Sequence, residues 1–354
     1  MRIGFRYRGA GVASMMLAMS CGSSTPSAQT ETASTPSPAL EGVPSASASP
    51  RGSESDSAPT PELLAGIRAF DAGKYGDAQK LFETATRKNQ SDPSAFLNLG
   101  LACEKAGDRT AAESAYKAAL ARKPDLESAV EELGALYIDE DRATDAIAIL
   151  RPATRSHPSN GALHENLGVA LASHGDAAEA RAELEQAVRM APHVPMYRLT
   201  LAHWLVAWRD PEALTQLDTA RELAKGDIGL IVSVGFELRM AGAFAPCVKT
   251  FDRAIEIQDG GEVRTERALC KLGLKDDHGA RADLQAAVER EPGYGPAHYY
   301  LAGRLAADKN FVAAATEYQK YLTVEPNGSL SKQASERLKA AKEAASGGKG
   351  SLMK

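Results

Sequence analysis

The feature that most constrains the fold of this chain is a repeat of 34 residues. Glycines and prolines recur at that interval through most of the sequence, at Gly100, Gly134 and Gly168, at Pro124, Pro158 and Pro192, and again at Pro292 and Pro326. A period of this length is typical of a helix–turn–helix unit that buries its apolar face only by stacking on its neighbours. The period therefore predicts an all-α protein built as a solenoid of helical hairpins.

The clearest repeat, residues 94–124, reads SAFLNLGLACEKAGDRTAAESAYKAALARKP. Gly100 permits two helices to approach closely, and Gly107 suits the left-handed backbone that ends a helix. Small and large apolar residues share one side of the second helix, and Pro124 breaks the chain before the next unit. This pattern resembles the tetratricopeptide repeat family, and the resemblance implies a right-handed solenoid.

The same pattern recurs with variations about eight times between residues 61 and 326. The segment 331–345 is rich in lysine and glutamate, as expected of a helix that caps the exposed end of a solenoid. We therefore expect eight tetratricopeptide-like repeats and a capping helix over residues 61–345. Residues 346–354 are expected to be a disordered tail.

The first residues have the layout of a secretory signal. Three arginines precede a short apolar stretch, and Cys21 follows small residues. This arrangement resembles the lipobox of bacterial lipoproteins, in which the cysteine is the lipidated first residue of the mature chain. Ala18 stands where that family prefers leucine, and Ala18 and Ser20 also fit ordinary signal cleavage. We predict a signal peptide over residues 1–20 and lipidation of Cys21, with ordinary secretion as the alternative.

Residues 21–60 are interpreted as the anchoring cysteine followed by a linker. The stretch is mostly Ser, Thr, Pro and Ala and has no aromatic residue, so it cannot bury enough apolar surface to offset its ordering entropy. A flexible linker of this length spans roughly 35 Å on average. No apolar run after the N-terminus is long enough to predict a transmembrane helix.

The sequence contains no arrangement of residues typical of catalysis, of a cofactor site or of a metal site. There is no HExxH, no CxxC, no GxxxxGK[ST] and no GxSxG motif. His164 and His298 occupy a slot that holds a bulky core residue in the family, so we expect them to pack in the core. The net charge of −5 and the absence of a basic cluster argue against nucleic acid as a partner. The sequence leaves open whether Cys247 and Cys270, in neighbouring repeats, are bonded.

The resemblance also implies where a partner binds. In the family, the first helices of the repeats line a concave groove that takes a peptide or an amphipathic helix. If that register holds, the groove residues of the later repeats are mostly apolar or aromatic and suit such a partner: Met196, Leu199, His203, Val206, Val232, Phe236, Tyr299 and Tyr300.

These observations predict a non-enzymatic adaptor of the bacterial cell envelope that assists the assembly of an envelope complex. Its partners are expected to be proteins, together with a membrane reached through the lipid anchor. Gly22 after the cysteine favours the outer membrane, with the folded part facing the periplasm. Two alternatives are an accessory subunit that docks an enzyme or a glycan, and a soluble periplasmic or secreted repeat protein.

Overall fold

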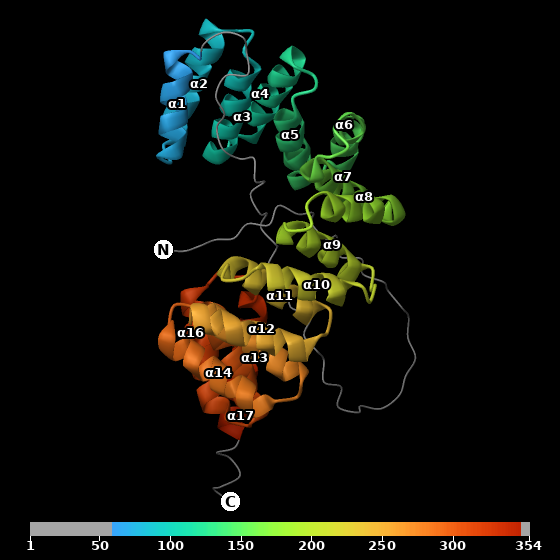
Figure 1. Cartoon of the computed structure of the whole chain (residues 1–354). Coiled ribbons are helices and arrows are strands. Elements are labelled where there is room, and N and C mark those ends of the chain that lie inside the picture. Colours follow the sequence, from blue (N-terminus) through green and yellow to red (C-terminus); the bar gives the residue numbers. More distant parts are fainter. Residues whose placement is uncertain (1–58, 348–354) are drawn as a thin grey trace, which may run out of the picture. The chain divides into compact units, whose positions relative to one another are not determined.

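The computed structural model describes residues 59–347, which form seventeen α-helices and no strand. These residues divide at Pro192 and His193 into two compact units. Unit 1 contains α1 (Pro61–Asp71), α2 (Tyr75–Lys88), α3 (Pro93–Ala106), α4 (Arg109–Arg122), α5 (Glu127–Asp139), α6 (Ala143–Ser156), α7 (Gly161–His174) and α8 (Ala177–Met190). Successive helices pair as antiparallel hairpins (Figure 1).

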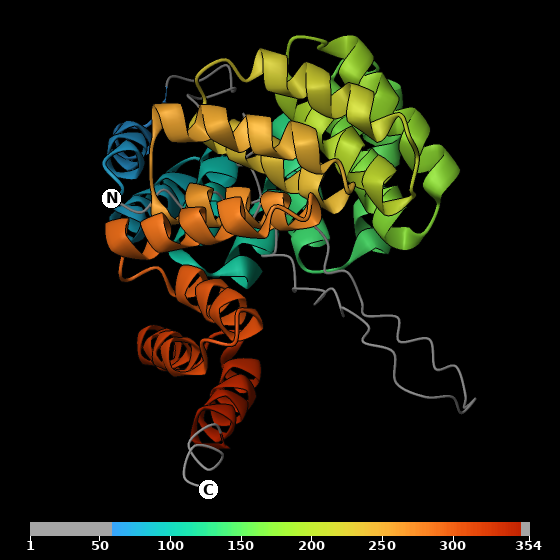
Figure 2. The same cartoon turned by 90° about the horizontal axis from the view of Figure 1, so that it is seen from below.

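Unit 2 contains α9 (Pro195–Ala207), α10 (Ala213–Leu223), α11 (Ile228–Met240), α12 (Phe244–Ile257), α13 (Gly261–Gly273), α14 (Asp277–Arg290), α15 (Gly295–Ala307), α16 (Phe311–Val324) and α17 (Ser331–Gly347). The final helix α17 follows the last hairpin at the red end of the chain and packs on α16 (Figure 2). The predicted all-α fold of helix–turn–helix repeats is confirmed over the described residues, with four hairpins in unit 1 and four hairpins and the predicted capping helix in unit 2.

Polar caps and prolines set the starts of many helices. The side chains of Asp92, Asp108 and Asn160 accept hydrogen bonds from backbone N–H groups in the first turns of α3, α4 and α7. Pro93 occupies the first turn of α3, where its missing N–H costs no helical hydrogen bond.

Every hairpin turn contains one residue with a positive φ angle. These residues are Gly73, Gly107, Asp141, Gly175, Arg209, Gly242, Lys275 and Lys309. Only half of them are glycine, because other residues can adopt this conformation at a cost of about 1–2 kcal/mol. Glycine therefore marks only part of the repeat in the sequence.

In several hairpins, a glycine of the first helix packs directly against a large buried side chain of the second helix. In α3, a Cβ atom added to Gly100 would lie 2.4 Å from the ring of Tyr116 in α4. The same clash relates Gly66 to Phe82, Gly134 to Leu150, Gly168 to Leu184 and Gly235 to Phe251. In these five pairs the partner lies sixteen residues later and is fully buried, so this close approach sets the geometry of their hairpins.

Candidate partner-binding surface

The first helices of the hairpins line the inner surface of each unit. In unit 1, α1 contacts α3, α3 contacts α5, and α5 contacts α7. In unit 2, α9 contacts α11, α11 contacts α13, and α13 contacts α15. The second helices of neighbouring hairpins make no comparable contacts within the described residues. This difference in spacing makes the first-helix side of each unit concave.

The predicted groove residues of α9 and α11 are largely half-buried. Met196 and Val206 lie on α9, and Val232 and Phe236 lie on α11. Met196, Val206 and Val232 pack against a core cluster of unit 2 while keeping part of their surface exposed. The ring of Phe236 meets that of Phe251 edge to face, with the centroids 6.2 Å apart. We call Met196, Val206, Val232 and Phe236 the α9–α11 apolar surface.

The structure corrects the prediction for two of the groove residues. Leu199 is 1% exposed and belongs to the core cluster of unit 2. Tyr299 is 3% exposed, and its hydroxyl donates to the side chain of Gln333 on α17 over 3.0 Å. Both side chains are enclosed by neighbouring helices, so neither can form part of a surface that a partner contacts. Tyr300 is half-buried and packs edge to face against Tyr299.

His203 connects α9 with the neighbouring inner helix. Its Nδ1 atom lies 2.9 Å from Oε1 of Glu237 on α11, whose side chain is almost fully buried. Burial disfavours the charged imidazole, but the hydrogen bond and the charge of Glu237 outweigh it, so the pKa of His203 is raised. The pair places a polar contact beside the α9–α11 apolar surface.

Two neighbouring tryptophans were not among the predicted groove residues, one on α9 and one directly after its last residue. Trp204 and Trp208 are half-buried, and their ring centroids lie 6.0 Å apart. The ring of Trp204 also meets that of His203 edge to face. Because residues four apart on a helix are neighbours, the spacing of the two tryptophans in the sequence predicts that their side chains meet.

Further along the inner helices, α11 and α13 are joined by a buried ion pair. The guanidinium of Arg239 lies 3.1 Å from Oε2 of Glu266. Burial raises the pKa of Glu266 to about 7, against the opposing charge of Arg239. Glu262, one turn earlier on α13, adds a like charge that also raises the pKa of Glu266.

This raised pKa predicts a pH-dependent stability. The folded carboxyl of Glu266 holds its proton to higher pH than an unfolded one with the usual value of 4.5. Its contribution is therefore fully present below that value and is lost as pH rises through about 7. Relative to Glu266→Gln, the wild-type free energy of unfolding should fall on the order of 2 kcal/mol between about pH 5 and pH 8.

Chemical denaturation of both proteins across that pH range measures the difference. Glu256→Gln, at an exposed carboxyl on α12, is the matched control and should leave the pH profile unchanged. Parallel profiles for wild type and Glu266→Gln would show that Glu266 is ionised throughout.

In unit 1, two acidic residues of the inner helix α5 are internal. Glu131 and Glu132 on α5 are buried. Oε1 of Glu131 accepts a hydrogen bond from Nδ2 of Asn160 at 2.6 Å, and its backbone carbonyl accepts one from Asn166. Glu131 and the two asparagines therefore connect neighbouring repeats.

The expectation that His164 and His298 pack in the core is confirmed, because both are buried. Each ring also makes two polar contacts that the sequence did not predict. Nδ1 of His298 lies 2.6 Å from Oε2 of Glu317, and Nε2 lies 3.0 Å from the carbonyl of Pro292. His164 repeats both contacts with Glu183 and Pro158 at the same sequence separations. Because the two histidines share this spacing to a glutamate and a proline, aligning the repeats with one another would reveal both sets of contacts from the sequence.

The cysteines of the described residues are all buried. Cys247 on α12 and Cys270 on α13 form a disulfide with their Cα atoms 6.0 Å apart. Cys103 is a free thiol, and burial raises its pKa to about 11, which suppresses its reactivity. The bond between Cys247 and Cys270, left open by the sequence, is present in the structure.

The part of the chain that the structure describes contains no group of three or more His, Cys, Asp or Glu residues placed to hold a metal ion. Over the same residues, 59–347, no helix is long and apolar enough to cross a membrane. Cys21, the signal peptide and most of the linker lie outside the described residues. The predicted lipidation therefore stays a prediction.

Comparison with known proteins identifies the repeats. Residues 63–127, 132–195 and 278–329 match the model of the tetratricopeptide repeat, and together they cover just over half of the chain. No curated protein sequence matches this chain.

Solved structures with the same hairpin arrangement include yeast Tom70, with a TM-score of 0.58 and 16% identity over 84% of this chain and 68% of that chain. A tetratricopeptide repeat protein from Parabacteroides merdae has a TM-score of 0.51 and 16% identity over 72% of this chain and 100% of its own. A thermophilic repeat protein from Thermus thermophilus is 28% identical over 50% of this chain and 97% of its own, with a TM-score of 0.44. At 16% identity, the first two likenesses concern the fold alone.

Proposed function

The chain belongs to the tetratricopeptide repeat family, whose repeats serve protein–protein interaction, and from this we propose that it is a non-enzymatic adaptor of the bacterial cell envelope. A lipid on Cys21 would hold it to a membrane, and the inner surface of its repeats would bind a protein partner. The adaptor would assist the assembly of an envelope complex. The observation that carries this proposal is that the four side chains of the α9–α11 apolar surface stay partly exposed on neighbouring first helices of unit 2.

The physical case for binding rests on apolar side chains that the fold leaves partly exposed. Met196, Val206 and Val232 are anchored against the core, so they are already ordered before a partner arrives. An ordered apolar surface loses little conformational entropy on binding, and burying it further is favourable. An amphipathic helix or an extended apolar segment has the complementary chemistry.

The case for the envelope rests on two separate features. The first 21 residues carry the pattern of a lipoprotein signal. The disulfide between Cys247 and Cys270 fits an oxidising compartment such as the periplasm, because cytosolic disulfides are rare.

Mass spectrometry of the mature N-terminus tests the anchor. A diacylglycerol-modified Cys21 that disappears in Cys21→Ala supports it, and an unmodified mature terminus favours the soluble alternative.

Site-specific photocrosslinking tests the binding surface. A photoreactive phenylalanine analogue placed at Phe236 should capture a protein partner in intact cells, because this ring lies on the α9–α11 apolar surface. The matched control carries the same analogue at Ile257, an exposed apolar residue on the second helix α12. Equal capture from the two positions, or capture from Ile257 alone, would contradict the inner-surface assignment.

A further inference from the structure

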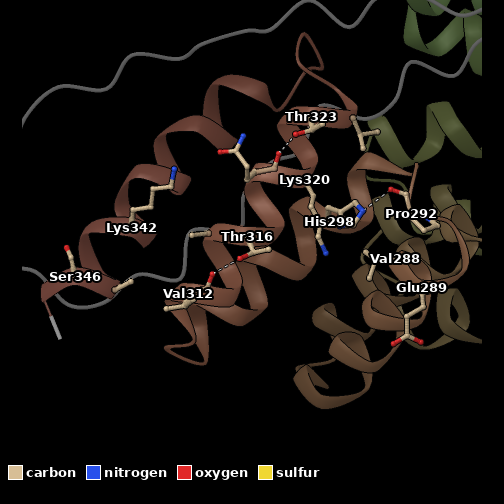
Figure 3. A pocket seen from close by; sticks show the side chains of 14 residues that line it. Val288, Glu289, Pro292, His298, Val312, Thr316, Lys320, Thr323, Lys342 and Ser346 are labelled. Carbon is tan, nitrogen blue, oxygen red and sulfur yellow. Dashed lines mark hydrogen bonds between the residues drawn. The ribbon is translucent and has the colours of Figure 1, made fainter. Parts of the chain in front are cut away.

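A second apolar site lies away from the inner surface, over the second helix of the last hairpin. It is an open cavity of about 970 Å³ in unit 2. Figure 3 shows Lys342 and Ser346 of α17 on one side, Val288 and Glu289 of α14 on the other, and residues of α16 between them. A cavity of this size is within the range that holds a small ligand.

The wall formed by α16 carries apolar side chains at both ends, with Thr316, Gln319, Lys320 and Thr323 between them. Val312 is 68% exposed and Val324 is 38% exposed, although both are large apolar side chains. Ala315 lies between them on the same wall. Twelve residues of α-helix separate the two valines, which corresponds to a track of about 18 Å. An extended hydrocarbon chain is long enough to span the distance between the two apolar ends of this track.

The polar groups of this wall are mostly satisfied within the protein. The hydroxyl of Thr316 donates to the carbonyl of Val312 over 3.1 Å, and that of Thr323 donates to the carbonyl of Gln319 over 2.9 Å. His298 is committed to Glu317 and to the carbonyl of Pro292. An apolar ligand would therefore leave few buried polar groups without a partner.

One lysine of the lining is available to an anionic head group. Lys320 on α16 and Lys342 on α17 both line the cavity, against the single carboxylate of Glu289. The ammonium of Lys320 lies 2.7 Å from Oε1 of Glu317 and keeps about half of its side chain exposed. Lys342 is exposed, and it makes no ion pair with another of the described residues. A carboxylate near Lys342 would gain a charge-assisted contact with this ammonium.

We infer that this cavity binds a single-chain anionic amphiphile of the fatty-acid type. The hydrocarbon chain lies along Val312, Ala315 and Val324, and the carboxylate lies at the lysine rim. The inference is independent of the proposed adaptor function, because it concerns a cavity along α16 and not the α9–α11 apolar surface.

Calorimetric titration of the purified full-length protein with dodecanoate, below its micelle concentration, tests the site. Octanoate should bind at least about tenfold more weakly, because fewer methylene groups are buried. Dodecyltrimethylammonium should bind more weakly than dodecanoate, because its head carries the charge of the rim.

Two variants and two matched controls locate the binding. Val312→Asp places a carboxylate in the apolar wall and should weaken dodecanoate binding at least about tenfold, and Lys342→Gln should weaken it about threefold. Leu214→Asp, at an exposed apolar residue on α10, and Lys249→Gln, at an exposed lysine on α12, should leave the affinity unchanged. Circular dichroism verifies that each variant keeps its helicity.

Saturable binding of dodecanoate that Val312→Asp and Lys342→Gln weaken, and the controls do not, establishes the site. Absence of binding overturns the inference. So does binding that is indifferent to both variants, or equal affinity for the cationic detergent. Binding of an acidic amphipathic peptide in place of dodecanoate, abolished by Val312→Asp, would assign the cavity to a protein segment instead.

Discussion

Replacing Gly100 with valine is expected to lower the free energy of unfolding by about 3 kcal/mol or more, and replacing it with alanine by about 2 kcal/mol. A Cβ atom at this position would lie 2.4 Å from the ring of Tyr116. Tyr116 is fully buried, so its ring cannot move aside without displacing the rest of the hairpin core. The steric cost outweighs the gain in helix propensity that alanine brings.

Gly303 provides the matched control. It also lies inside a first helix, α15, but an added Cβ would have no neighbour closer than 3.7 Å. Gly303→Ala should therefore stabilise the protein by about 0.5–1 kcal/mol, the usual benefit of replacing a helical glycine. Denaturant melts of Gly100→Ala and Gly303→Ala measure whether each substitution lowers or raises the free energy of unfolding. A stabilised Gly100→Ala would contradict the role of close helix approach in these hairpins.

Reducing the disulfide between Cys247 and Cys270 is expected to lower the free energy of unfolding by about 3 kcal/mol. The bond closes a loop with a sequence separation of 23 residues and so restricts the unfolded chain. Its Cα–Cα distance of 6.0 Å is within the usual range for a disulfide. For a unit of this size the loss corresponds to a fall in Tm of about 8 °C.

Thermal melts with and without a reductant measure this shift, once mass spectrometry has verified the state of the cysteines. The control is the double variant Cys247→Ala with Cys270→Ala, whose Tm should not respond to the reductant. An equal Tm for the oxidised and reduced wild type would show that the bond does not restrict the unfolded chain.

The repeat architecture was predictable because its signals are local. Gly100 and Gly107 mark the close approach and the turn, and Pro124 marks the end of the hairpin, each through a backbone property that the residue type alone implies. Turns that use Arg209 or Lys275 in the same conformation carry no such mark. The positions of those turns were predicted from the 34-residue period and not from the residues in the turns themselves.

The inner surface was less predictable because first helices are covered on several sides. In α5, every residue from Ser128 to Ile138 is buried, including Glu131 and Glu132. A helix enclosed in this way has no simple polar face, so periodicity does not separate core from surface. Leu199 and Tyr299 were misplaced for this reason.

The cavity over α16 depends on residues far apart in sequence. Its walls combine Val288, Val312 and Lys342, which belong to three different helices. None of these residues is unusual within its own helix. Only the packing of α17 against α16 brings the apolar track and the lysine rim together.

Recovery of a partner from native membranes tests the central claim most directly. The protein, tagged after Lys354, would be crosslinked and purified alongside the variant Val232→Glu with Phe236→Glu and the control Ile257→Glu, after all three are shown to be equally helical. The adaptor account predicts that wild type and control recover the same envelope protein and that the double variant loses it. Recovery of that protein by all three would contradict the account and place binding outside the α9–α11 apolar surface.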